Sequence, residues 1–265
     1  MIFQVMGGDE RQRHLARYIK EKGFTVYEKI KEQDPPPRWD ADILILPLPV
    51  SKDQAHLFMP FCKDAYSLGE VGASFQGRLI FGGMLPQGAY PCPAIDYYEN
   101  EGLLWSNAAL TAEGAIGLAV GSTPLSLWET NVLVLGAGRI GRILAMELKA
   151  LGAKVLVGVR RQESVDLCRA MGLKARLYED LPLGKFPLVF NTVPARILGR
   201  ERLKRLPKGA YLIELASSPF GFDKEEAAEE GLIPIGAAGL PGRYSPKKAA
   251  ELIGEIIIKE MENFG

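Results

Sequence analysis

The sequence predicts an α/β protein made of two Rossmann-like parallel-sheet domains joined by long helices, with the C-terminal helix packing back on the N-terminal domain. Short apolar runs alternate with helical periods along most of the 265 residues, which is the pattern of parallel βαβ units. The 29 glycines lie largely after apolar runs, where tight turns end strands. A hydrophobic content of 47% with 24% charged residues is ordinary for a globular protein.

The first hundred residues predict a small α/β half. Ile2–Met6 is its first strand, Gly7-Gly8 forms the turn, and Asp9–Lys22 forms the helix that follows. The span 50–76 is poorly patterned, and we expect only some helix there. Further strands of this half are expected at Phe24–Tyr27, Ile43–Leu46 and Leu79–Phe81.

A second half follows a connecting helix, predicted over Asn107–Val120, and Pro124 marks the boundary. The last helix starts at Ser245 and Pro246, because Ser is a good N-cap and Pro a good first residue. Strands are expected at Val132–Leu135, Lys154–Val159, Leu188–Phe190, Tyr211–Leu215 and Leu232–Ile235. The expected division is a substrate and partner domain (1–106 with the helix 245–265), a connector (107–123) and a nucleotide-binding domain (124–244).

Composition argues against several function classes. Lys and Arg number 32 and Asp and Glu number 32, so a formal net charge of zero disfavours a nucleic-acid binder or a polybasic membrane-surface protein. Three widely spaced cysteines without a CxxC pair and two histidines offer little for a metal site or a disulfide framework, so we expect neither. Because we find no apolar run near about 18 residues and no basic leader, we expect a cytoplasmic protein.

One glycine motif carries most of the functional argument. Gly136, Gly138 and Gly141 form a GxGxxG string directly after an apolar strand and at the start of a predicted helix, with Arg139 and Ile140 inside it. The first glycine allows a tight turn, the second lets a pyrophosphate approach the positive helix end, and the third permits close helix–strand packing. This context predicts a dinucleotide site; the alternative is a glycine-rich turn without a ligand.

The end of the next strand indicates which dinucleotide binds. A site for NAD usually has Asp or Glu there, to accept a hydrogen bond from the ribose 2′-OH. Here Lys154–Val159 is followed by Arg160 and Arg161, and the first carboxylate is Glu163. Two guanidiniums suit a 2′-phosphate, so we expect NADP as the cofactor. The alternative is a solvated arginine pair that ends the strand.

Two further segments are candidates for ligand contacts. The loop after Leu188–Phe190 lies near the switch point of a dinucleotide fold and suits the nicotinamide ribose or carboxamide; the alternative is an Asx turn. Arg243 and Lys247 flank the start of the last helix, where the helix dipole disfavours cations unless an anion binds. They are therefore a candidate site for a carboxylate or phosphate, and the alternative is that the lysines are only solvated. The loop consists of Asn191, Thr192, Val193 and Pro194.

Two helix starts carry polar groups that local physics explains as caps. Asp9, Arg11 and Gln12 lie in the first turn of the first helix, where Asp9 is a natural N-cap. Thr111 and Glu113 lie near the start of the connecting helix. There Thr111 suits a hydrogen-bond acceptor of the first turn, and Glu113 suits a carboxylate whose charge interacts favourably with the helix dipole. We find no nucleophile–base pair, paired-carboxylate motif or HExxH string that competes with the dinucleotide motif.

An ordered set of strings resembles a family of spore-forming bacteria, that of the dipicolinate synthase A subunit. The strings are GGDERQ at 7–12, NAALTAEG at 107–114, VLVLGAGRIGRILA at 132–145, FNTVP at 190–194, ELASSPFGFD at 214–223 and GLPGRYSPKKA at 239–249. Each is modest alone, and the ordered set is specific. Residues 28–105 match poorly, Leu110 replaces an expected proline and Phe220 replaces an expected glycine, which alters the expected loop shapes and not the class.

The resemblance implies NADP-dependent oxidation of dihydrodipicolinate, or of its hydroxy-tetrahydro precursor, to dipicolinate on a branch of the lysine pathway during sporulation. It also implies a partner, the flavoprotein-like B subunit, and the mother-cell cytoplasm as location. Transfer of a hydride to NADP leaves a proton to remove, and Glu113, followed by Asp9, is the candidate base. Candidates that bind the dicarboxylate substrate are Arg11, Gln12, Asn107, Thr111, Ser217, Arg243 and Lys247.

Alternative functions stay open. Another two-domain NADP dehydrogenase, of the shikimate or methylene-tetrahydrofolate type, would show a Lys–Asp pair, and none is convincing among Lys52, Asp53, Lys63 and Asp64. A non-catalytic nucleotide-binding scaffold for the B subunit fits as well, because the motif indicates binding and not turnover. Ile258 lies outside one core-facing stripe of the last helix, so a homo-oligomer is open too.

Overall fold

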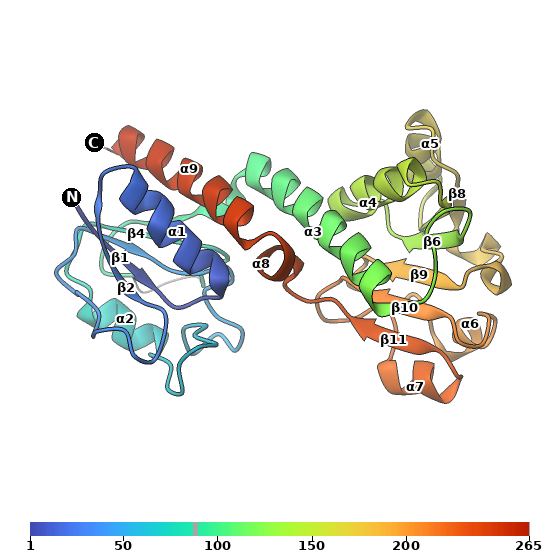
Figure 1. The fold of residues 1–265 in the computed structure, drawn as a ribbon, viewed down its shortest axis with the longest axis horizontal. Helices are drawn as coiled ribbons and strands as arrows, with labels where there is room; N and C mark the ends of the chain where they lie inside the picture. Colours follow the sequence, from blue (N-terminus) through green and yellow to red (C-terminus); the bar gives the residue numbers. More distant parts are fainter. Residues whose placement is uncertain (87–89, 265) are drawn as a thin grey trace. The chain divides into compact units, whose positions relative to one another are not determined.

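The computed structural model describes residues 1–86 and 90–264, which divide into two compact units (Figure 1). One unit comprises Met1–Asn107 with residues 241–264, and the other comprises Ala108–Leu240. Each unit contains one sheet, and every strand pair described in the two sheets is parallel. The predicted class, two Rossmann-like parallel-sheet domains, is confirmed.

The sheet of the first unit has the order β2-β1-β3-β4-β5. Its central strands contribute Phe3, Ile45 and Phe81 to one apolar cluster, as expected for strands covered on both faces. The strands are β1 (Ile2–Met6), β2 (Thr25–Lys29), β3 (Ile43–Ile45), β4 (Leu79–Gly82) and β5 (Ala94–Asp96). The helical elements between them are α1 (Glu10–Glu21), α2 (Leu68–Ser74) and the 3₁₀ helix η1 (Tyr97–Glu99).

The C-terminal helix α9 (Pro246–Phe264) packs on α1, as predicted. Leu15 of α1 and Ile257 of α9 are both fully buried in the same cluster, and burying each such side chain stabilises the fold by about 1.5–3 kcal/mol. Gly254 permits the close approach of the two helices, because a Cβ there would lie 2.4 Å from Cδ1 of Tyr18.

The sheet of the second unit has the order β11-β10-β9-β6-β7-β8. Counted from β6, the chain adds strands first toward β8 and then, from β9 on, toward β11, which is the doubly wound order with a switch point between β6 and β9. The strands are β6 (Asn131–Leu135), β7 (Lys154–Val159), β8 (Ala175–Leu177), β9 (Leu188–Asn191), β10 (Tyr211–Glu214) and β11 (Ile233–Gly236). The helical elements are α4 (Arg139–Ala150), α5 (Gln162–Ala170), η2 (Tyr178–Asp180), η3 (Leu183–Lys185), α6 (Arg200–Leu203) and α7 (Lys224–Glu229), followed by α8 (Leu240–Tyr244), which starts at the end of this unit.

The connecting helix α3 (Glu101–Ser122) is longer than the predicted Asn107–Val120. It starts earlier because the side chain of Asn100 accepts a hydrogen bond from the backbone N–H of Leu103 at 3.0 Å, which caps the helix. By length and composition alone α3 also meets the criteria for a membrane span, but 44% of its apolar window is buried in the protein, and the core helix of a soluble protein meets the same criteria. Ala112, Ala115, Leu118 and Ala119 of α3 pack in the core of the second unit.

Candidate functional site

The turn after β6 has the shape that a pyrophosphate-binding turn requires. Gly136 has a φ of +101°, which favours glycine, and a Cβ there would lie 2.5 Å from Oγ1 of Thr192. A Cβ on Gly141 would lie 2.2 Å from the carbonyl oxygen of Gly136. Geometry alone therefore requires glycine at two of the three motif positions, and the absence of a Cβ at Gly141 lets α4 pack close to the turn.

The middle glycine, Gly138, faces open space. Among the described residues, no atom lies within 4 Å of a Cβ placed there. Gly138 is the N-cap residue of α4, whose fully described first turn has neither a side-chain cap nor an acidic residue. The half-buried Arg139 and Ile140 follow it. The helix start therefore offers backbone N–H groups and a positive dipole end to an anion, and the residues present fit the pyrophosphate of a dinucleotide.

Arg160 and Arg161 directly follow β7, and both are exposed. Arg161 is the N-cap residue of α5. Arg160 lies near Tyr178: burial raises the pKa of the Tyr178 hydroxyl, and the charge of Arg160 acts against this rise. Two cations thus stand at the strand end where a site for NAD usually has a carboxylate, an arrangement that suits a phosphate on the 2′-oxygen.

The loop after β9 is tied to the turn after β6. Thr192 donates from Oγ1 to the carbonyl oxygen of Leu135 at 2.8 Å. Asn191 is fully buried; its Nδ2 donates to Oε1 of Glu214 at 2.7 Å and to the carbonyl oxygen of Val193 at 2.9 Å, while its Oδ1 accepts from the N–H of Val193 at 3.2 Å. The Asn191 side chain therefore forms the Asx turn that the sequence left as an alternative, and Pro194 in the same loop is exposed.

Glu214, the last residue of β10, was not selected from the sequence. It is 3% exposed, and it accepts hydrogen bonds from the N–H groups of Ala216 and Gly221, each at 2.9 Å. Burial raises the pKa of this carboxyl, while the hydrogen bonds that Asn191, Gly221 and Ala216 donate act against the rise. The available signal was a carboxylate at the carboxyl end of a strand beside the switch point, where side chains adjoin the ligand edge of the sheet.

In the first unit, Asp9 and Arg11 form an ion pair at the start of α1. Asp9 caps the helix by accepting from the N–H of Arg11 at 3.0 Å, and its Oδ2 lies 2.8 Å from Nη2 of Arg11. The same Nη2 donates to the carbonyl oxygen of Leu48 at 2.6 Å. A Cβ on Gly242 would lie 2.3 Å from Oδ2 of Asp9, so α8 packs against the pair. The two side chains thus hold three segments of this unit together.

The described side-chain contacts of the other predicted substrate residues of the first unit are made with other partners, although the backbone N–H of Gln12 donates to the carbonyl oxygen of Asp9 at 3.0 Å. Arg243 and Lys247 are exposed, whereas Gln12 is buried. Nε2 of Gln12 donates to the carbonyl oxygen of Met6 at 3.2 Å, and Nδ2 of Asn107 donates to the hydroxyl of Tyr98 at 3.5 Å. The guanidinium of Arg243 lies 5.6 Å from the centroid of the Tyr244 ring. Nζ of Lys247 lies 4.0 Å from Oε1 of Glu251.

Thr111, Glu113 and Ser217 belong to the second unit. Thr111 is buried in α3, Glu113 lies on an exposed face of that helix, and Ser217 is exposed in the loop after β10. The pKa of Glu147 is raised mainly by burial, and the negative charge of the nearby Glu113 raises it further. Within the described residues, no group of three or more His, Cys, Asp or Glu side chains is placed to hold a metal ion.

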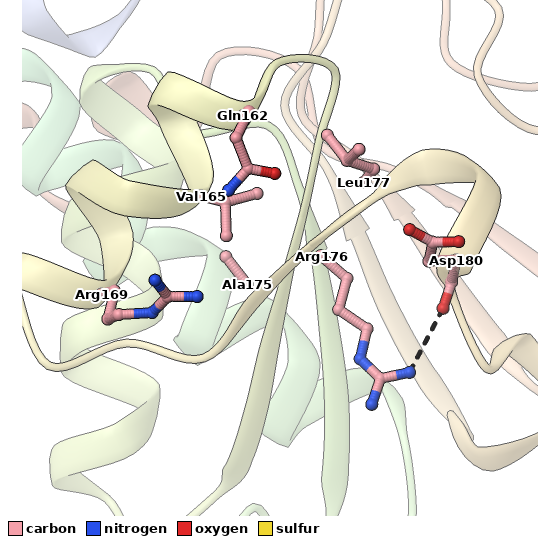
Figure 2. Close-up of a pocket in the computed structure, with 7 residues that line it drawn as sticks. All are labelled: Gln162, Val165, Arg169, Ala175, Arg176, Leu177 and Asp180. Carbon is pink, nitrogen blue, oxygen red and sulfur yellow. Dashed lines mark hydrogen bonds between the residues drawn. The ribbon is translucent and has the colours of Figure 1, made fainter.

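A pocket of about 430 Å³ lies between α5 and β8. Figure 2 shows the side chains that line it. Arg176 points toward the segment after β8, where its Nη1 donates to the carbonyl oxygen of Asp180 at 3.4 Å. The lining residues are Gln162, Val165, Arg169, Ala175, Arg176, Leu177 and Asp180. They come from α5, β8 and η2, so this pocket is separate from the turn after β6.

Comparisons with known proteins match both units. Residues 2–89 match the family of the N-terminal domain of the dipicolinate synthase A subunit, and residues 113–220 match the NAD binding domain of D-isomer specific 2-hydroxyacid dehydrogenases. The dipicolinate synthase A subunit of Bacillus subtilis is 27% identical over 280 residues, which cover 96% of this chain and 94% of that protein.

Two solved structures have the same fold over nearly the whole chain. The A chain of dipicolinate synthase from Bacillus subtilis has a TM-score of 0.80 at 26% identity, covering 99% of this chain and 96% of that one. The corresponding protein from Bacillus halodurans has a TM-score of 0.83 at 24% identity, covering 97% of each chain. The second unit is accordingly a dehydrogenase-type domain for a nicotinamide cofactor. Over nearly its whole length the chain is therefore similar to the dipicolinate synthase A subunit.

Proposed function

We propose that this protein is the NADP-dependent oxidoreductase component of a dipicolinate synthase. The observation that carries the proposal is the turn after β6: Gly138 opens onto the uncapped start of α4, and the neighbouring strand ends in Arg160 and Arg161 instead of a carboxylate. The family supports the reaction class, and the arginine pair supports the choice of NADP over NAD.

The chain's own residues take distinct parts in this proposal. When bound, NADP supplies the hydride acceptor. Gly138 and the N–H groups of α4 hold the pyrophosphate, while Arg160 and Arg161 hold the 2′-phosphate through charge-assisted hydrogen bonds. Glu113 accepts the proton that leaves with the oxidation. Asp9 is the weaker candidate base, because its carboxylate is already ion-paired with Arg11.

The proposed substrate is dihydrodipicolinate or its hydroxy-tetrahydro precursor, a small dicarboxylate. The exposed cations Arg243 and Lys247 of the first unit suit its carboxylates. Arg11 and Gln12 contribute by shaping the start of α1, because they donate to Asp9, Leu48 and Met6 within the fold. Partnership with the B subunit, the role in sporulation and the mother-cell cytoplasm follow from the family as part of the same proposal.

Parallel calorimetric titrations of the purified chain with NADP⁺ and NAD⁺ test the cofactor. We expect tighter binding of NADP⁺. Arg160→Ala should weaken it about ten- to a hundredfold, because it removes charge-assisted hydrogen bonds worth about 1.5–3 kcal/mol, and should leave NAD⁺ binding nearly unchanged. Arg169→Ala is the matched control, since Arg169 is an exposed arginine of α5 that pairs with Asp166.

A preference for NAD⁺ would leave the fold in place and contradict the assignment of the arginine pair. Binding of neither dinucleotide, with or without the B subunit, would contradict the proposed oxidoreductase function. Binding without hydride transfer, in a complex with substrate and the B subunit, would favour the non-catalytic scaffold.

A further inference from the structure

The carboxylate of Glu214 lies in an environment of hydrogen-bond donors. Its Oε1 accepts from Nδ2 of Asn191 at 2.7 Å and from the N–H of Ala216 at 2.9 Å, and its Oε2 accepts from the N–H of Gly221 at 2.9 Å. Lys224 of α7 is the charged side chain whose field acts on it. A buried carboxylate without such partners would be strongly destabilising, so these contacts define its place in the fold.

We propose that Glu214 is a positioning residue: its ionised carboxylate holds the loops 191–194 and 215–221 in the shape that binds the nicotinamide end of the dinucleotide, without touching the dinucleotide itself. This inference rests on the proposed function. Both loops leave the carboxyl ends of β9 and β10, beside the switch point where ligands of doubly wound sheets bind. A single buried side chain therefore connects two candidate ligand-binding loops.

The contacts require the ionised form. All three groups that Glu214 contacts are N–H donors, and an ionised carboxylate, which only accepts hydrogen bonds, satisfies each of them. A protonated carboxyl, or the amide of glutamine, would place a donor against one of these N–H groups and lose at least one hydrogen bond. Glu214→Gln is therefore nearly isosteric and still expected to loosen one loop.

Asn191 is held from the opposite side by Gly221. A Cβ on Gly221 would lie 2.2 Å from Nδ2 of Asn191 and 2.3 Å from its Cγ. Any larger residue would therefore displace the amide that bridges Glu214 and Val193. Gly221→Ala thus disturbs the same contacts while it leaves the carboxylate in the chain, and it provides an independent test.

The first experiment compares wild type with Glu214→Gln and Gly221→Ala. Amide hydrogen exchange of Val193, Ala216 and Gly221 reports loop order without any cofactor, and calorimetric titration with NADP⁺ reports affinity. We expect faster exchange at these amides and about tenfold or greater weakening of NADP⁺ binding, the size expected from one lost hydrogen bond to a charged group. Leu203→Ala, a core variant in α6, controls for general destabilisation and should leave exchange at these amides and NADP⁺ affinity close to wild type.

The second experiment uses Asn191→Asp, which places two carboxylates at the distance of the present 2.7 Å contact. Such a pair retains one proton, so the pKa of the pair is raised above the ordinary carboxyl range. A raised pKa in the folded state means that the contact is intact at low pH and is lost as pH rises. We therefore expect NADP⁺ binding by Asn191→Asp to recover toward the wild-type value as pH falls from 8 to about 5.

The outcomes separate this inference from the proposed function. Wild-type exchange rates in Glu214→Gln and Gly221→Ala, or wild-type NADP⁺ affinity in both, would overturn the positioning role. A pH-independent Asn191→Asp would overturn it as well, because a merely space-filling side chain creates no shared proton. If the wild-type chain binds neither dinucleotide, the proposed function fails, and the exchange rates still decide whether Glu214 orders the loops.

Discussion

Replacing Gly138 with alanine tests the dinucleotide cradle directly, because the change should affect binding and not folding. A Cβ at this position meets no described atom within 4 Å, and the backbone φ of −73° is one that any residue adopts. The free energy of unfolding should therefore change by less than about 0.5 kcal/mol. A pyrophosphate on the N–H groups of α4 would meet the new methyl group. Loss of one or two charge-assisted hydrogen bonds, at about 1.5–3 kcal/mol each, weakens binding at least about tenfold.

Gly141→Ala is the matched comparison, in which thermal stability is expected to fall. Its Cβ would lie 2.2 Å from one backbone oxygen and 3.0 Å from a backbone carbon of Gly136, so the clash cannot be relieved by rotating a side chain. Such overpacking costs about 1–3 kcal/mol, and each kcal/mol lowers the thermal midpoint of a chain of this size by about 2–4 °C. Thermal unfolding and calorimetric titration with NADP⁺ would be measured for wild type and both variants.

Two results would refute the reasoning. Wild-type NADP⁺ affinity in a stable Gly138→Ala protein would mean that the pyrophosphate does not lie over this glycine. A loss of thermal stability in Gly138→Ala as large as in Gly141→Ala would mean that the space beside Gly138 is not open.

Two further predictions concern the first unit and the proposed base. Arg11→Met leaves the Asp9 carboxylate without its ion-pair partner and should cost about 1–3 kcal/mol in unfolding free energy. Arg13→Met, which breaks an exposed pair with Glu10, should cost at most about 1 kcal/mol, and equal thermal midpoints would contradict the structural role of the partly buried pair of Asp9 and Arg11. Glu113→Gln should lower turnover about a hundredfold or more in the complex with the B subunit, with NADP⁺ affinity retained, and undiminished turnover would exclude Glu113 as the base.

The main elements follow from local patterns in the sequence. The apolar runs of β1, β6 and β7, the glycine turn after β6 and the Ser245-Pro246 helix start are each read within a few residues, and each is found near its predicted place. The edge strands β5 and β8 were not predicted, because three-residue strands with partly exposed side chains leave too weak a pattern. Helix α2 could not be located either, although a reciprocal Ser67–Glu70 cap starts it.

The residues of the candidate site also divide into those that the sequence predicted and those that it did not. The sequence by itself determined the dinucleotide turn and the arginine pair, because glycine spacing and strand ends are properties of contiguous residues. Only the tertiary structure decided that Asn191 serves a turn and a buried carboxylate, that Glu214 connects two loops, and that Arg11 is committed to Asp9 and Leu48. Those contacts join residues up to 37 positions apart. Burial strengthens them and raises the pKa of Glu214, and it exists only once each sheet has assembled.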